Sequence, residues 1–324
     1  MAHELDTMED GRARMAYSGT ETPWHGLGQQ LTEDATLDVW HKEAGMDWNI
    51  IETPVLYKED SFEGVVPGRK VLLRNDTGSP LAVVGDQYKV VQPGEVLDFF
   101  ADLIDHLGFK MSTAGVLFGG RRFWALADTG RAAEILKNDT VKGNLLLTTA
   151  CDGTLATTAQ FTSIRVVCNN TLRIALGDNA QARLRVSHRT TFDPKSIKEQ
   201  LGLIDTGWDR FISSITDMTK VELAPQEGAD FLIKLLGDPA LAVSDQSPAV
   251  ARKAGAVFDL WQGAGMGSNL DGVQGTLWGL LNGVTEYVDY HTGHRTVDAR
   301  MDNALWGSGE ELKTKAFELA KEYV

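Results

Sequence analysis

Two hydrophobic patterns divide the chain, and the change comes near Pro194. From Trp48 to Thr191 the apolar residues form short alternating runs, and Gly, Pro, Asn and Asp separate these runs. This pattern is typical of strands joined by turns. After Pro194 the apolar residues recur every three or four positions, which is typical of helices. Strands followed by a run of helices predict an α+β fold, with an antiparallel-rich sheet and a helical C-terminal third.

The strand-rich part is expected to supply the sheet. Its predicted strands are residues 49–57, 70–74, 81–84, 88–91, 109–117, 122–127, 144–150, 154–167 and 183–191. A helix is predicted over residues 93–107, because Pro93 suits a first helical position and one apolar stripe continues as far as Gly108. Asn169, Asn170 and Thr171 suit the end of a strand and the N-cap of a short segment at residues 172–176.

The remaining helices are predicted from apolar residues at helical spacing. They are residues 34–44, 196–219, 226–236, 249–261, 273–290 and 309–323. The elements divide the chain into three expected parts. These are an acidic arm with a short helix at residues 1–47, an α+β sheet domain at residues 48–193, and a helical region at residues 194–324 that packs on the sheet domain.

The composition is that of an ordinary globular protein, with 43% hydrophobic and 23% charged residues among 324. No apolar run is long enough to cross a bilayer, and the polar, acidic N-terminus lacks the pattern of a signal peptide. We therefore expect a cytoplasmic protein with no membrane partner. The two cysteines are too few for a disulfide scaffold, and no Cys-x-x-Cys pair indicates a zinc ribbon.

Two motifs suggest ligand binding, and neither has the context that it needs. The glycine-rich residues 263–272 follow a segment with a helical pattern, whereas a phosphate-binding loop follows a strand. We interpret them as a loop between helices. His291 and His294, with Asp289 nearby, lack a third metal ligand at a workable spacing. We interpret them as the end of a helix, where histidines favour the negative end of the dipole, and expect no metal and no cofactor.

Catalytic side chains are equally hard to assemble from the sequence. Cys168 has no recognisable base, so we expect a buried structural cysteine. Trp24 and His25 stand in a short aromatic motif that suits docking through the indole, and no partner nucleophile for the histidine can be named. An enzyme is therefore disfavoured. A hydrolase or nuclease with Asp, Glu and His metal ligands is the least favoured alternative.

The distribution of charge is uneven and suggests a partner. A formal net charge of −14 argues against a protein that coats nucleic acid by bulk charge. Residues 160–200, however, hold seven Lys and Arg against three Asp and Glu. Guanidinium rows beside aromatic rings are typical of grooves for single strands, where charge contacts phosphates and rings stack on bases. The candidate contacts are Arg121, Arg122, Phe123, Trp124, Arg165, Arg173, Arg183, Arg185 and Arg189. The alternative is a solvated strand face that pairs with the acidic N-terminal third.

Several segments, in order along nearly the whole chain, resemble a family of phage- or plasmid-like proteins of unknown function from actinobacterial prophages and plasmids. The similar stretches are residues 15–19, 23–28, 85–92, 151–153, 165–172 and 281–289. The resemblance implies a mobile-element origin and carries no activity that can be transferred residue by residue.

A second resemblance concerns the order of elements. Strands, then the helix at residues 93–107, then a hairpin around Gly119 and Gly120 resemble the core of phage and eukaryotic single-strand annealing proteins. That resemblance implies rings or helical filaments that hold DNA in a basic groove without nucleotide cofactors.

The leading hypothesis from the sequence is a phage- or plasmid-encoded DNA-handling protein. It would bind or anneal single-stranded DNA as a homo-oligomer, without breaking covalent bonds. The arginines named above would contact phosphates, and Phe123 or Trp124 would stack on bases. The alternative is a non-enzymatic protein-interaction module that engages a host or phage partner through its acidic surface.

Overall fold

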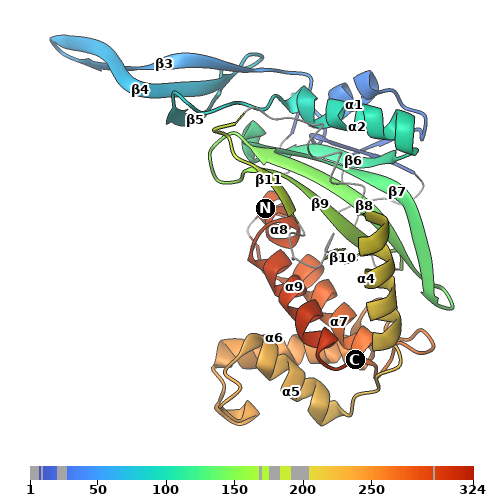
Figure 1. Ribbon diagram of the computed structural model, residues 1–324. Coiled ribbons are helices and arrows are strands. Elements are labelled where there is room, and N and C mark those ends of the chain that lie inside the picture. Colours follow the sequence, from blue (N-terminus) through green and yellow to red (C-terminus); the bar gives the residue numbers. More distant parts are fainter. Residues whose placement is uncertain are drawn as a thin grey trace. The chain divides into compact units, whose positions relative to one another are not determined.

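The computed structural model describes residues 7, 8, 10–19, 28–167, 170–174, 183–190, 204–294 and 296–324. The chain divides into two compact units that interleave along the sequence (Figure 1). Unit 1 comprises Met1–Gly130, Asn144–Phe161 and Arg183–Gly202, and unit 2 comprises Arg131–Gly143, Thr162–Ala182 and Leu203–Val324. The units interleave because three long strands contribute residues to both.

The larger sheet has eight strands in the described residues and is mainly antiparallel. Its order is β10-β9-β8-β7-β6-β1-β2, and β11 also pairs with β9. The strands are β1 Met15–Ser18, β2 Gln29–Leu31, β6 Lys110–Leu117, β7 Arg122–Leu136, β8 Asp139–Ala150, β9 Thr157–Arg165, β10 Asn170–Arg173 and β11 Arg183–Val186. β1 and β2 run parallel, whereas β1–β6, β6–β7, β9–β10 and β9–β11 are antiparallel. The predicted α+β class with an antiparallel-rich sheet is confirmed.

A second sheet of three antiparallel strands belongs to unit 1. Its strands are β3 Ile50–Glu59, β4 Phe62–Arg74 and β5 Pro80–Gly85. The register of β3 on β4 shifts between Pro54 and Leu56, where residues 66–69 of β4 bulge out of the pairing. In Figure 1 this hairpin is a long ribbon whose tip extends away from α1 and α2 of the same unit.

Two helices belong to unit 1, α1 Leu37–Glu43 and α2 Pro93–Leu107. α2 has the bounds predicted from sequence, and its ends explain why. Pro93 stands in the first turn, and the Glu95 carboxylate accepts a hydrogen bond of 2.6 Å from the Gln92 backbone N–H. At the other end Gly108 adopts a φ of 68°, which a residue without Cβ reaches at little cost. Local sequence therefore determines both ends of this helix.

Unit 2 contains the C-terminal helices, in the region where the periodicity after Pro194 predicted helical structure. They are α4 Ile204–Met218, α5 Pro225–Leu236, the 3-10 helix η3 Val243–Asp245, α6 Pro248–Asp259, the π-helix η4 Leu260–Ala264, α7 Leu277–Glu286, the π-helix η5 Tyr287–His291, α8 Val297–Leu305 and α9 Ser308–Lys321. Every residue of α7 is buried, so this helix forms the centre of the unit's core. None of the described helices is long and apolar enough to cross a membrane.

Some local predictions were wrong, each for a physical reason. Residues 88–91 form no strand, because Tyr88 uses its side chain for a tertiary contact described below. The expected N-cap at Thr171 gives way to strand β10, which pairs with β9. Helix α8 was missed because its surface is polar, although Thr296 caps its start and Met301 lies on its buried side.

Candidate nucleic-acid interface

The loop between β8 and β9, residues 151–156, connects several segments of unit 1. The backbone N–H of Cys151 donates to the carbonyl oxygen of Arg121 at 2.9 Å, which ties the loop to the start of β7. The Tyr88 hydroxyl donates to the Ala150 carbonyl at 2.7 Å, which brings in the segment before α2. These contacts join segments that lie far apart in the sequence.

His188 ties the turn after β11 to the same loop. Its Nε2 lies 3.0 Å from the Leu155 carbonyl oxygen, and its Nδ1 lies 3.2 Å from the Lys89 carbonyl oxygen. The imidazole stacks on the Tyr88 ring, with the centroids 4.5 Å apart and the planes at 18°. The Lys89 backbone N–H donates to the His188 carbonyl at 2.6 Å. Tyr88 and His188 are half-buried, so they form a fixed pair of rings at the surface.

Four exposed basic residues belong to the segments that these contacts join, and we call them the basic cluster: Lys89, Arg121, Arg185 and Arg189. Arg185 lies on β11 opposite Thr158 of β9, and Arg189 directly follows His188. The four residues are exposed, and no described residue forms an ion pair with any of them. The sequence predicted the three arginines and missed Lys89.

Three residues next to Arg121 do not have the predicted role of contacting a ligand. Phe123 is fully buried and Trp124 is only 3% exposed, because both belong to the packed part of β7. Neither ring presents a face to a base in this fold, which corrects the expected stacking role. Arg122 is also buried, and its Nη2 donates to Thr154 Oγ1 at 2.9 Å. Burial lowers the pKa of Arg122, and its contact positions the loop.

Arg165 belongs to unit 2 and is held in a buried ion pair. Its Nε and Nη2 lie 2.6 and 2.8 Å from the two carboxylate oxygens of Asp139, a bidentate arrangement. The Trp278 indole N–H donates to the same carboxylate at 2.9 Å. Arg165 is 2% exposed and Asp139 is fully buried, so this guanidinium is a structural group of the core. This burial corrects the predicted phosphate contact.

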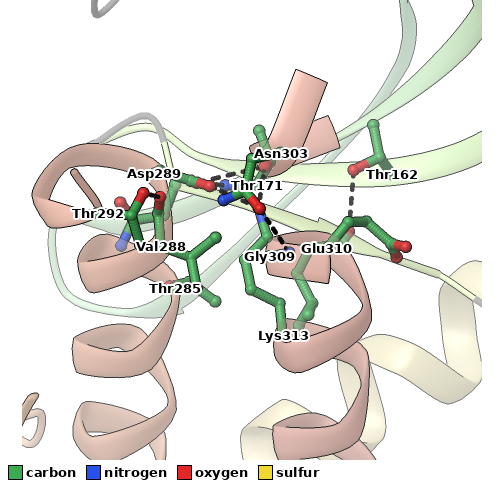
Figure 2. Close-up of polar contacts among 12 residues, drawn as sticks. Thr162, Thr171, Thr285, Val288, Asp289, Thr292, Asn303, Gly309, Glu310 and Lys313 are labelled. Atoms are coloured by element: carbon green, nitrogen blue, oxygen red, sulfur yellow. Dashed lines mark hydrogen bonds and ion pairs between the residues drawn. The ribbon is translucent and has the colours of Figure 1, made fainter. Parts of the chain in front are cut away.

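Arg173 lies on β10, also in unit 2, and its Nε lies 3.2 Å from the Glu310 carboxylate of α9. A second buried pair stands beside it (Figure 2). The Lys313 ammonium group lies 2.6 Å from Asp289 Oδ1 and donates to Thr171 Oγ1, also at 2.6 Å. Carboxylates of the C-terminal helices therefore pair with Arg173 of β10 and with Lys313 of α9. Arg173, like Arg165, is corrected from a ligand contact to a structural ion pair.

Arg183 lies in β11 opposite Gln160, and its side chain lies outside the described part of the chain. β11 places Arg183 and Arg185 on one face of the strand, as their alternation predicted. The predictions for Cys168, Trp24 and His25 also concern positions outside the described residues.

The two motifs that suggested ligand binding have structural partners. The Glu286 carboxylate accepts a hydrogen bond of 2.8 Å from the Met266 backbone N–H and lies 3.5 Å from His291 Nε2. A buried carboxylate at the glycine-rich loop disfavours an anionic ligand there. The pKa of His294 is lowered, mainly by burial and secondly by the charge of Arg300. Within the described residues, no group of three or more His, Cys, Asp and Glu is placed to hold a metal ion.

Cys151 is expected to react slowly with iodoacetamide in the folded protein. Burial, assisted by the charge of Asp152, raises the pKa of its thiol to about 12, so the reactive thiolate is scarce at neutral pH. Peptide mass spectrometry after a timed alkylation should find Cys151 unmodified without urea and modified in urea. Rapid alkylation of the native protein would show that this thiol is accessible and activated.

Comparison with known proteins identifies the family. Neither a curated protein nor a solved structure matches the chain. Residues 80–306, more than half of the chain, match the family described as "Domain of unknown function (DUF932)". The matched range runs from β5 to α8 and so includes the basic cluster and the buried Arg165–Asp139 ion pair. The chain belongs to the DUF932 family.

Proposed function

We propose that unit 1 binds single-stranded DNA through the basic cluster. The observation that carries this proposal is that four exposed cations, none in an ion pair with a described residue, lie on segments joined at the loop of residues 151–156, in a chain whose net charge is −14. Charged side chains that have no partner of their own are available to phosphates. The structural ion pairs of Arg165 and Arg173 leave the basic cluster as the part of the sequence-based interface that remains exposed.

The stacked rings of Tyr88 and His188 take the stacking role first assigned to Phe123 and Trp124. They are half-buried, held by the hydrogen bond from the Tyr88 hydroxyl to Ala150 and by the contacts of both His188 ring nitrogens with carbonyl oxygens, and next to Lys89 and Arg189. A rigid ring beside cations is the arrangement that binds a flexible strand, because a base stacks at low entropic cost while its phosphate meets a charge. Because every base can stack and every phosphate carries a charge, we expect the protein to bind single strands with weak sequence preference.

Binding or annealing of strands requires no bond to be broken, and we propose a non-enzymatic role in DNA handling for a phage- or plasmid-encoded protein. The resemblance to mobile-element proteins supports this role. Annealing requires that one oligomer hold two strands, and we propose a homo-oligomer without a nucleotide cofactor. Negative charge elsewhere on the chain confines the strand to the basic cluster, because it repels phosphates from the remaining surface.

The double variant Arg185→Ala/Arg189→Ala is expected to weaken binding and to reduce its salt dependence. If both side chains contact phosphates, the slope of log K against log[salt] falls in magnitude by about 1.4 for a single strand. Fluorescence anisotropy with labelled oligothymidine at several salt concentrations measures this slope. The matched control is Arg252→Ala/Lys253→Ala, which removes the same charge from exposed positions on α6 of unit 2. An equal change in both variants would mean that the cluster is no specific site.

Replacing Tyr88 by Leu is expected to weaken binding by about 1–3 kcal/mol without changing the salt slope, because stacking releases no counterions. Tyr88→Phe keeps the ring and removes only the hydroxyl that donates to Ala150, and thus separates stacking from loop anchoring. Binding by the Phe variant should stay close to wild type. An equal loss in both variants would assign the effect to the hydrogen bond.

A protein-interaction module is the second candidate function. Exposed apolar side chains on the β3–β4–β5 sheet favour it.

A further inference from the structure

The ring of His188 meets two acceptors, and in its neutral form it has only one donor. Its Nε2 lies 3.0 Å from the Leu155 carbonyl oxygen, and its Nδ1 lies 3.2 Å from the Lys89 carbonyl oxygen. Both distances are those of hydrogen bonds, and a carbonyl oxygen can only accept. A neutral imidazole donates from one ring nitrogen and turns the lone pair of the other toward an oxygen. Only the protonated ring donates to both carbonyls.

The two carbonyls belong to different segments of unit 1. Leu155 lies in the loop of residues 151–156, and Lys89 lies in the segment before α2. His188 itself follows β11, so its ring connects three segments that carry members of the basic cluster or contact them. A ring that donates to only one carbonyl leaves the other junction without its hydrogen bond.

The Tyr88 ring favours a protonated imidazole in a second way. It stacks on His188 with the centroids 4.5 Å apart, and a cation over the face of an aromatic ring is attracted by the quadrupole of that ring. Burial is the main cause that raises the pKa of the Tyr88 hydroxyl, and burial also raises the pKa of the Cys151 thiol to about 12. Both groups are therefore uncharged at neutral pH, and the charges that act on His188 come from other side chains.

Among the described residues, the charges on the segments that contact His188 have both signs. Asp152 of the loop favours a positive ring, because its negative charge reaches Tyr88, on which the ring stacks. The basic cluster opposes a positive ring, and so does Arg122, which donates to a side chain of the same loop. A bound phosphate changes this balance, because it offsets the charge of the cluster and adds negative charge near the ring. Strand binding and proton uptake by His188 therefore favour each other.

We propose that His188 is a positioning residue of the strand-binding site and that it acts in its protonated form. The imidazolium holds the loop of residues 151–156 and the segment at Lys89 to the turn after β11, and it adds a positive charge to the basic cluster. The effect on DNA rests on the function proposed above, whereas the protonation of the ring does not. Acid pH then strengthens the site, and alkaline pH weakens it.

Nitrogen-15 NMR of the histidine rings tests the protonated form without nucleic acid. As the pH falls from about 7.5 to about 5.5, the range in which imidazoles titrate, the His188 ring should show two N–H protons, both protected from exchange with water because each is held by a carbonyl. The His188→Gln variant identifies these signals by their loss. Addition of oligothymidine should extend the protonated form to higher pH. A His188 ring that shows at most one protected N–H proton over this range overturns the proposal, whether or not DNA binds.

Fluorescence anisotropy at constant salt tests the effect on DNA binding. The affinity of the wild type for oligothymidine is expected to rise by about tenfold between about pH 7.5 and about pH 5.5, because a proton is taken up with the strand. His188→Gln keeps a polar side chain without a titrating ring and should lose most of this rise. His106→Gln is the matched control, because His106 is exposed in the last turn of α2, and it should keep the wild-type profile. Circular dichroism confirms that both variants are folded.

The outcomes separate this role of His188 from the function on which it rests. A wild type that binds equally well at every pH, or a His188→Gln variant that keeps the wild-type profile, overturns the role of His188 and leaves the strand-binding site in place. Absence of binding at every pH overturns the strand-binding site itself, and the positioning role with it.

Discussion

Lys313→Met is expected to lower the free energy of unfolding by about 3–5 kcal/mol, because it leaves a buried carboxylate without its counter-charge. Lys313 is 1% exposed and Asp289 is 3% exposed, and their charged atoms lie 2.6 Å apart. Thr171 donates to the same carboxylate from its backbone N–H at 2.9 Å (Figure 2). That hydrogen bond remains in the variant and is too weak to replace the lost charge. Urea denaturation followed by circular dichroism measures the loss.

The loss in Lys313→Met should be smaller at about pH 5 than at about pH 7. Burial raises the pKa of Asp289, and the Lys313 charge opposes that effect in the wild type. Without Lys313 the folded state holds a proton on Asp289 at pH values where the unfolded state has lost it. Unfolding then releases that proton, so stability falls as the pH rises through the pKa of the folded state.

The double variant Asp289→Leu/Lys313→Met separates the charge effect from packing. It removes both charges and is expected to recover most of the lost stability. A deficit in Lys313→Met that is the same at both pH values, together with no recovery in the double variant, would show that packing by the lysine side chain is responsible.

Asp139→Ala is the other substitution with a large expected effect, again about 3–5 kcal/mol of unfolding free energy. Asp139 is fully buried and accepts three hydrogen bonds, two from Arg165 and one from Trp278. Its removal takes the counter-charge from a buried guanidinium and the carboxylate acceptor from a buried indole N–H. Chemical denaturation measures the loss. The matched control is Lys234→Ala, which breaks the exposed ion pair with Glu322 and should change stability little.

Arg165→Ala distinguishes a structural arginine from a DNA contact. We expect it to destabilise the fold strongly while leaving the salt slope of DNA binding unchanged under conditions where the variant is folded. A normal stability with a flatter salt slope would contradict the structural role and restore Arg165 to the interface.

The sequence was sufficient for elements whose signals are local. α2 was predicted to the residue because Pro93, Glu95 and Gly108 specify its ends by themselves. The run of helices after Pro194 followed from periodicity in the same way. Strands β1 and β2 were missed, because they are short and gain their stability from pairing with each other and with β6. Pairing with strands elsewhere in the sequence therefore determines where β1 and β2 form.

The candidate interface could be predicted only in part, because exposure depends on partners far away in the sequence. Arg165 is buried by Asp139, 26 residues before it, and Arg173 is paired with Glu310, 137 residues after it. Nothing near either arginine in the sequence indicates these carboxylates. Lys89 joins the basic cluster through His188, at a separation of 99 residues. The local row of basic residues in the sequence identified Arg185 and Arg189, and both are exposed in the structure.

Titration of the wild-type protein with labelled single-stranded oligothymidine, at low and at physiological salt, tests the central claim most directly. The account predicts binding at low salt that weakens steeply as salt rises, because the basic cluster exchanges counterions for phosphates. It also predicts similar affinity for oligothymidine and for mixed sequences, because stacking tolerates every base. Absence of binding at low salt would contradict a role in DNA handling and leave the β3–β4–β5 sheet as the functional surface.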